Sequence, residues 1–328
     1  MTEYMGYLTW WTVPDVMAPY KELNNLAARL GFPAECVPKP PKPRHAWEKA
    51  ANVGGQRGLL LDTPVDLGNE VFIRRGVAPE VRLLTRRISD KAPALCRHLV
   101  REVTVGAAGR ADEQLSLRTV AVLDFDCLSN VGQVQHLTDY EGWTNGNVTA
   151  ITQDIDARYH ALLDNADGND VREGVRKLLE DLHRVGLRGT GGVYFVPDSA
   201  PDAESHLKAM RAFIKSLRPW VTGRMSPSCN TVRLYGEEAE HLRDEIIESA
   251  TEEFKRRLSD LADKVDPVLT GRVTGRTADK LAYAATEDLL KIQQAVAAYR
   301  DSLRDDFAAL GDMLVMAQRA VDQALVAN

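Results

Sequence analysis

The strongest constraint on the fold is a long series of apolar residues, spaced three or four apart, in residues 233–328. This spacing is the period of an α-helix, and a strand cannot produce it. One apolar series lies within 242–265 and a second within 281–321. A proline and two glycines separate the two series. The sequence therefore predicts two long helices that fold back on each other as an antiparallel hairpin.

The two predicted helices differ in length. At about 1.5 Å per residue, a helix over 236–265 is about 45 Å long, and one over 277–327 is about 75 Å long. The short helix cannot cover the long one, so we expect the far end of the long helix to need another partner. That partner is either a second copy of the chain or the chain's own N-terminal domain. The second apolar series has a mean step of about 3.6 residues, which favours a straight bundle over a strict coiled coil. The candidate oligomerisation residues at this far end are Leu303, Phe307, Leu310, Leu314 and Val321.

Composition limits the class of protein. Hydrophobic residues make up 44% of the 328 residues and charged residues 27%, as in ordinary globular proteins of two or three domains. No apolar stretch approaches the length of a membrane span, and the N-terminus lacks the features of a signal peptide. Four widely spaced cysteines without a Cys-x-x-Cys pair fit a reducing compartment. We therefore expect a cytoplasmic protein with no membrane contact, and no motif indicates a cofactor.

The chain divides by pattern into three predicted segments: a β-rich α+β domain (1–140), a small module of helix, turn, strand and helix (147–220), and the helical hairpin (233–328). Within the first segment, short runs rich in β-branched residues are bounded by glycine, proline and aspartate. The predicted strands are 71–73, 81–88, 99–105 and 115–125. Their short connections favour an antiparallel sheet, so the predicted fold class is α+β.

Charge is distributed unevenly along the chain. The net charge is +4 over 1–118, −4 over 119–232 and −6 over the remainder. Arginines that share one face of a strand attract phosphate backbones without reading base sequence. The alternative is that they are solvated or pair with the acidic segments. The candidate nucleic-acid contacts are Arg74, Arg82 and Arg86 in the β-rich domain and Arg272 and Arg276 at the turn of the hairpin.

Catalytic motifs are scarce. Asp124 and Asp126 end an apolar strand and share one of its faces, a geometry that a divalent metal site requires. The alternative is a strand that ends in solvated acids and a turn. The glycine-rich run 188–192 follows a predicted helix and precedes a strand, which is the wrong order for a phosphate loop. Histidines, serines and cysteines lie outside known catalytic spacings. The sequence therefore favours a non-enzymatic protein.

Three stretches resemble an uncharacterised protein family of actinobacteriophages, actinobacteria and haloarchaea. They are residues 6–13 (GYLTWWTV), residues 38–43 (PKPPKP) followed by 46–50 (AWEKA), and residues 187–197 (LRGTGGVYFVP). The resemblance covers most of the chain and implies a phage or mobile-element setting, in a bacterial host cell if the protein is phage-encoded. It transfers no catalytic residue.

Three functions remain open from the sequence. The first is a non-enzymatic scaffold or interaction module that self-assembles through its helical hairpin as a homo-oligomer. The second is a nucleic-acid-binding protein of phage replication or recombination that uses the basic β face. The third is a metal-dependent enzyme at Asp124 and Asp126.

Overall fold

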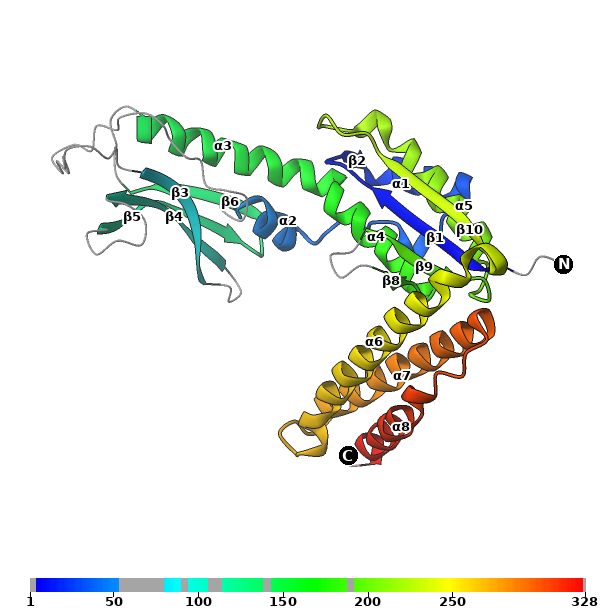
Figure 1. Cartoon of the computed structure of the whole chain (residues 1–328). Coiled ribbons are helices and arrows are strands. Elements are labelled where there is room, and N and C mark those ends of the chain that lie inside the picture. Colours follow the sequence, from blue (N-terminus) through cyan, green and yellow to red (C-terminus); the bar gives the residue numbers. More distant parts are fainter. Residues whose placement is uncertain are drawn as a thin grey trace. The chain divides into compact units, whose positions relative to one another are not determined.

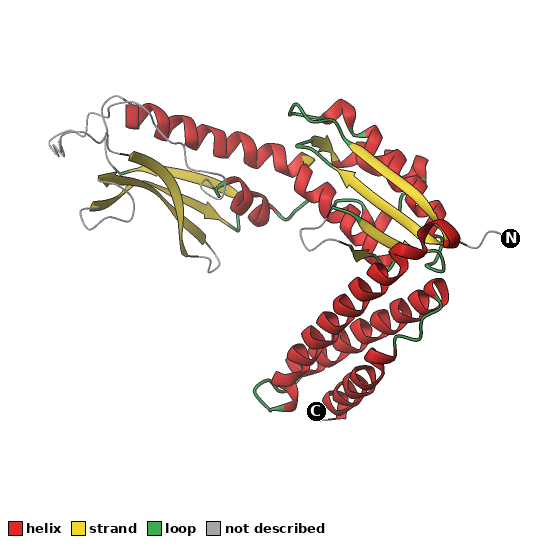
Figure 2. Ribbon diagram, viewed as in Figure 1, coloured by secondary structure: helices red, strands yellow, loops and turns green. Residues whose placement is uncertain are grey.

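The computed structural model describes residues 4–52, 80–89, 94–105, 114–137, 143–187 and 192–326. Two compact units make up the chain (Figure 1). The terminal unit joins Met1–Pro38 to Asp167–Asn328, and the central unit is Lys39–Ala166. Both units combine helices with antiparallel strands (Figure 2), which confirms the predicted α+β class.

The terminal unit is built on a four-stranded antiparallel sheet in the order β10-β1-β9-β8. The register of β1 against β10 runs from Tyr4 opposite Tyr235 to Thr12 opposite Ser228. The helix α1 packs against α5, and α5 packs against β10. The elements before the C-terminal helices are β1 (Tyr4–Thr12), β2 (Met17–Pro19), α1 (Tyr20–Leu30), α4 (Gly168–Asp181), β8 (Val185–Gly186), β9 (Tyr194–Pro197), α5 (Ala203–Ser216) and β10 (Ser228–Tyr235).

Three helices follow the last strand of this sheet: α6 (Gly236–Leu269), α7 (Arg276–Leu303) and α8 (Gly311–Val326). The first two form the predicted antiparallel hairpin, and α8 packs against both of them (Figure 1). The hairpin also packs on the sheet, because the Tyr299 ring meets Phe195 of β9 edge-on at 5.7 Å. The Tyr299 hydroxyl donates a hydrogen bond to the Phe195 carbonyl oxygen at 3.3 Å.

The prediction of one continuous helix over 277–327 is wrong. The helix α7 ends at Leu303, and Arg304 and Phe307 adopt left-handed backbone conformations. The Asp305 carboxylate accepts a hydrogen bond from the Phe307 N–H at 2.8 Å, and the Asp306 carboxylate accepts one from Ala308 at 3.1 Å. Such local bonds from aspartate to the backbone compete with the helix and favour a turn. The chain then reverses and continues as α8.

The central unit is a four-stranded antiparallel sheet in the order β3-β4-β5-β6, with α2 and α3 packed on one face. Trp47 of α2 stacks on Phe125 of β5 at 5.3 Å, and Tyr159 of α3 meets Phe125 edge-on at 5.7 Å. The elements are α2 (Pro43–Ala50), β3 (Glu80–Ser89), β4 (Ala94–Val105), β5 (Gln114–Asp126), β6 (Val131–His136) and α3 (Trp143–Asp164). The short strand β7 (Asn165–Asp167) lies at the boundary of the two units.

The strands predicted at 81–88, 99–105 and 115–125 are present as β3, β4 and β5, and the one at 71–73 lies outside the described residues. The three predicted segments differ from the two units, because β1 pairs with β10 and β9 rather than with the strands that follow it. Residues 1–38 therefore belong with the C-terminal half of the chain and not with a segment 1–140.

Candidate functional site

The candidate oligomerisation residues lie in the chain's own core. Exposed fractions of 1% for Leu303, 3% for Phe307, 0% for Leu310 and 1% for Val321 show that α6 and α7 already cover them. Leu314 is partly buried against the same cluster. The far end of the predicted long helix thus packs within the chain, because the chain reverses direction between α7 and α8. The same cluster includes Met5 of β1 and Phe195 of β9, so residues near the N-terminus help to cover it and no second copy is needed.

The candidate basic residues are dispersed. Arg86 lies on the sheet face that the helices leave open, and its guanidinium is 3.9 Å from the Glu102 carboxylate. At the turn of the hairpin, Arg272 pairs with the Asp266 carboxylate, and Arg276 is the first residue of α7. Arg82 lies in β3, and Arg74 falls outside the described residues. Nucleic-acid binding by these residues stays a prediction.

The candidate metal ligands share a face of β5, but each has a protein partner. Asp124 is hydrogen-bonded to Cys96, and burial followed by this bond raises the pKa of the thiol to about 11. The Asp126 carboxylate accepts hydrogen bonds from the Ser129 hydroxyl at 2.6 Å and the Leu128 N–H at 2.9 Å. These two bonds hold the Asp126 pKa below its usual value. Within the described residues, no group of three or more histidine, cysteine, aspartate or glutamate side chains is arranged to hold a metal.

Instead, the Asp126 carboxylate shapes the turn that positions β6. After this turn, Asn130 adopts a left-handed conformation (φ 57°), which asparagine tolerates better than most residues. Its carbonyl oxygen accepts a hydrogen bond from the Tyr159 hydroxyl at 3.1 Å, which ties the turn to α3. The strand that follows, Val131–His136, pairs with β5 and forms one edge of the central sheet.

The outer edge of β6 presents backbone groups that pair with none of the described strands. The Leu137 N–H donates to the Val120 carbonyl oxygen at 3.1 Å, so Leu137 belongs to a hydrogen-bonded pair with β5. In an antiparallel ladder such pairs alternate with pairs whose N–H and C=O groups point away. The outward groups are therefore those of Gly132, Val134 and His136. Within the described part of the chain, β6 pairs with no strand other than β5.

The outer strands of the two four-stranded sheets differ in how they are protected. All six residues of β6 are exposed, and none of them is an acid, a lysine, an arginine or a proline. Charged side chains lie on β3, the opposite edge of the same sheet, at Arg86 and Arg87. In the terminal unit, β8 has two residues and packs on α6, and Arg233 of β10 pairs with Glu204 of α5. Charges, short length and covering helices are the usual means of blocking edge-to-edge pairing. In the part of the chain that the structure describes, β6 has none of them.

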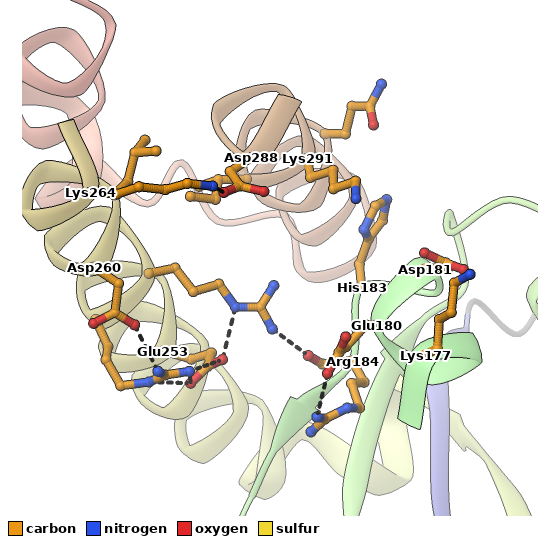
Figure 3. Close-up of a pocket in the computed structure, with 15 residues that line it drawn as sticks. Lys177, Glu180, Asp181, His183, Arg184, Glu253, Asp260, Lys264, Asp288 and Lys291 are labelled. Carbon is orange, nitrogen blue, oxygen red and sulfur yellow. Dashed lines mark hydrogen bonds and ion pairs between the residues drawn. The ribbon is translucent and has the colours of Figure 1, made fainter. Parts of the chain in front are cut away.

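A second candidate site is a groove in the terminal unit, with a volume of about 730 Å³ (Figure 3). Helix α6 supplies several of its charged side chains from one face, since residues three and four apart on a helix are neighbours. The lining residues are Lys177, Glu180, Asp181, His183, Arg184, Glu253, Arg256, Arg257, Asp260, Leu261, Lys264, Asp288, Lys291, Ile292 and Gln294.

Ion pairs cross the groove and line its walls. Glu253 of α6 is 2.9 Å from Arg256 and 2.8 Å from Arg257. Lys264 of α6 reaches Asp288 of α7 at 2.6 Å, and Arg184 reaches Glu180 of α4 at 3.3 Å. The Arg184 guanidinium also lies over the Tyr194 ring, 4.7 Å from its centre.

His183 stands between α4 and β8 with a left-handed backbone (φ 58°). Burial first, and then the nearby Arg257 charge, lower the pKa of the imidazole, while Asp181 opposes them. The lowered pKa favours the neutral imidazole, and the other basic side chains that line the groove are lysines and arginines.

The sequence did not predict either the exposed edge strand β6 or the groove of the terminal unit. The strand β6 gives little signal, because Val131, Val134 and Leu137 do not alternate strictly with polar residues. The Asp126 to Asn130 turn after a strong strand is the signal that could have found it. The groove collects residues from 177–184, 253–264 and 288–294, which no local spacing connects.

The fold defines a two-unit α+β protein in which, among the described residues, one strand of the central sheet has an exposed outer edge. Residues 4–328 match the model of a family of unknown function, DUF6744, and the chain belongs to that family. No curated protein and no solved structure matches the chain. None of the helices in the described ranges has both the length and the apolar character needed to cross a bilayer.

Proposed function

We propose that the protein is a non-enzymatic interaction module that self-associates by pairing β6 with β6 of a second copy. The observation that carries this proposal is a wholly exposed edge strand without acids, lysines or arginines, whereas the other edges among the described strands are charged, short or covered. The sequence alone predicts self-association through the helical hairpin. The burial of Leu310 and Val321 by α6 and α7 now favours the sheet edge instead.

The strand is chemically complementary to itself in one antiparallel register. A twofold axis at Val134 places this residue opposite its own copy, and its outward N–H and C=O groups bond reciprocally. On the open face of the sheet, Gln133 then meets the partner's Gln135, and Val131 meets the partner's Leu137. Val131, Val134 and Leu137 are 48%, 41% and 45% exposed, so each has apolar area left to bury. Gly132 lies opposite the partner's His136, where the absence of a side chain leaves room for the imidazole.

The energetics favour a reversible complex. This register forms about six backbone hydrogen bonds across the interface, which contribute about 3–9 kcal/mol at about 0.5–1.5 kcal/mol each. Association costs about 4–15 kcal/mol in translational and rotational freedom. The two terms are similar in size, so the burial of the apolar side chains decides the balance. We therefore expect a weak dimer that forms at high protein concentration and dissociates on dilution.

The setting proposed for this module is the cytoplasm, within a phage or mobile element. All four cysteines are free, and Cys36 and Cys229 are buried. Unpaired thiols are typical of proteins in reducing compartments. The phage or mobile-element setting rests on the sequence resemblance.

A charge on the edge strand tests the proposal. Val134→Lys places two like charges opposite each other in the dimer and adds the edge lysine that blocks strand pairing. We expect light scattering, extended to the highest soluble protein concentration, to give a mass that rises toward twice 36.3 kDa for the unaltered protein. The Val134→Lys variant should stay at the monomer mass.

The matched control is Val232→Lys, which adds the same charge to β10 at a residue with a similar exposed fraction, 48%. This variant should dimerise like the unaltered protein. A monomeric mass for the unaltered protein, or equal masses for the two lysine variants, would contradict the proposal.

A further inference from the structure

The groove of the terminal unit contains more positive than negative charge. Six of its lining side chains are lysine or arginine and five are aspartate or glutamate, whereas the whole chain carries a net charge of −6. The groove is therefore a locally positive region of an acidic protein. A local charge of this kind attracts anions more strongly in a recess than on an open surface.

The carboxylates of the groove are already occupied. Glu180, Glu253, Asp260 and Asp288 each pair with a lysine or arginine of the groove. The remaining acid, Asp181, lies 3.9 Å from the Cys36 thiol. These contacts neutralise the acids and leave little free carboxylate for a cation. An anionic ligand fits the groove better.

Several donors of the groove remain without an acceptor among the described residues. The buried Nε of Arg184 has no hydrogen-bond partner. Arg257 uses Nε toward Glu253 and Nη2 toward the Arg184 carbonyl oxygen, which leaves Nη1. Lys291 of α7, an exposed residue that lines the groove, forms no ion pair within the described ranges (Figure 3). These are the donor types that bind phosphate oxygens.

We infer that this groove binds a small anion of the polyphosphate class, with Lys291 and the guanidinium groups of Arg184 and Arg257 as its donors. Guanidinium groups give paired, directional hydrogen bonds to phosphate oxygens, and a lysine adds a mobile point charge. The two arginines are held in place by Glu180 and Glu253, so the ligand meets preformed donors. The volume of about 730 Å³ lies within the range of small-molecule sites.

This site is independent of strand pairing, because all of its residues belong to the terminal unit, whereas β6 belongs to the central unit. A chain that fails to dimerise still has the groove. Anion binding can therefore be tested in a chain that does not dimerise, and dimerisation can be tested in a chain that does not bind the anion.

Titration calorimetry with inorganic pyrophosphate on the full-length chain, at constant ionic strength, tests the inference. We expect saturable binding, and Lys291→Glu should weaken it by about tenfold or more, since a charge-assisted contact is lost and a like charge replaces it. The control is Lys280→Glu, which makes the same charge change on α7 at an exposed residue outside the groove lining. It should bind pyrophosphate as the unaltered chain does.

Absence of saturable pyrophosphate binding to the unaltered chain would overturn the inference. Equal weakening by both glutamate variants would also overturn it, because it would indicate attraction to the general charge of the protein and not to the groove. Both positions are exposed, so both variants are expected to fold.

Discussion

Phe307→Ala is expected to destabilise the protein by about 3–5 kcal/mol, as measured by urea unfolding, because it empties a buried aromatic site. Phe307 is 3% exposed and lies where α7 has ended and the chain turns toward α8. Its ring meets both Phe254 and Tyr299 edge-on, with ring centres 6.3 Å apart in each case. The side chain thus joins α6, α7 and the reversal into one core.

The control for this variant is Val315→Ala on α8. Val315 is 51% exposed, so its truncation should change the free energy of unfolding by less than about 0.5 kcal/mol. Equal, small effects of the two substitutions would mean that Phe307 and the reversal after α7 do not pack against α6 and α7. The long helix would then need an external partner, as its apolar period first suggested.

Proline at two neighbouring positions of β6 should have opposite consequences. The Val134 N–H points away from β5, so Val134→Pro removes no hydrogen bond within the sheet, and proline is tolerated at such edge positions. In the dimer the same change removes the two reciprocal bonds between the copies of Val134. We expect the dimer to weaken by about five- to 150-fold, from about 1–3 kcal/mol of lost bonding.

Gln133→Pro is the companion variant. The Gln133 N–H belongs to the ladder with β5, opposite Asp124, so its loss should lower the stability of the central unit by about 1–3 kcal/mol. Sedimentation equilibrium over a range of concentrations gives the dissociation constant, and urea unfolding gives the stability. If Val134→Pro proves the less stable of the two variants, the register of β6 on β5 is shifted by one residue. If it leaves the dissociation constant unchanged, the edge is not the interface.

Local patterns predicted the elements of this fold better than their partners. The helical period identified α6 and α7, and Gly31 ends α1 in the left-handed conformation that glycine favours. The break after Leu303 escaped prediction because the apolar period continues across it. The spacing of Leu303, Phe307 and Leu310 suits one helix as well as two that share a core. Only the aspartates at 305 and 306 distinguish the two arrangements, and their capping role depends on the turn itself.

Contacts between residues far apart in the sequence explain the remaining differences between the predicted and the observed structure. The strand β1 lies beside β10, more than 200 residues away, and no pattern near Tyr7 or Arg233 indicates that register. The groove likewise forms only when α6 and α7 pack beside α4 and β8. Asp124 and Asp126 share a strand face as predicted, but Cys96 and Ser129 are their partners. The alternation of side chains along a strand determines which face of the sheet a residue occupies. It does not determine which residues of other segments lie beside it.

Residue-resolved amide hydrogen exchange, measured by NMR at high and low protein concentration, tests the central claim most directly. The N–H groups of Val131, Gln133 and Gln135 bond to β5 and should be protected at both concentrations. The N–H groups of Gly132, Val134 and His136 should be protected only at the concentration where the dimer forms. Fast exchange of these three groups at both concentrations, in a chain that still protects their neighbours, would contradict pairing through β6.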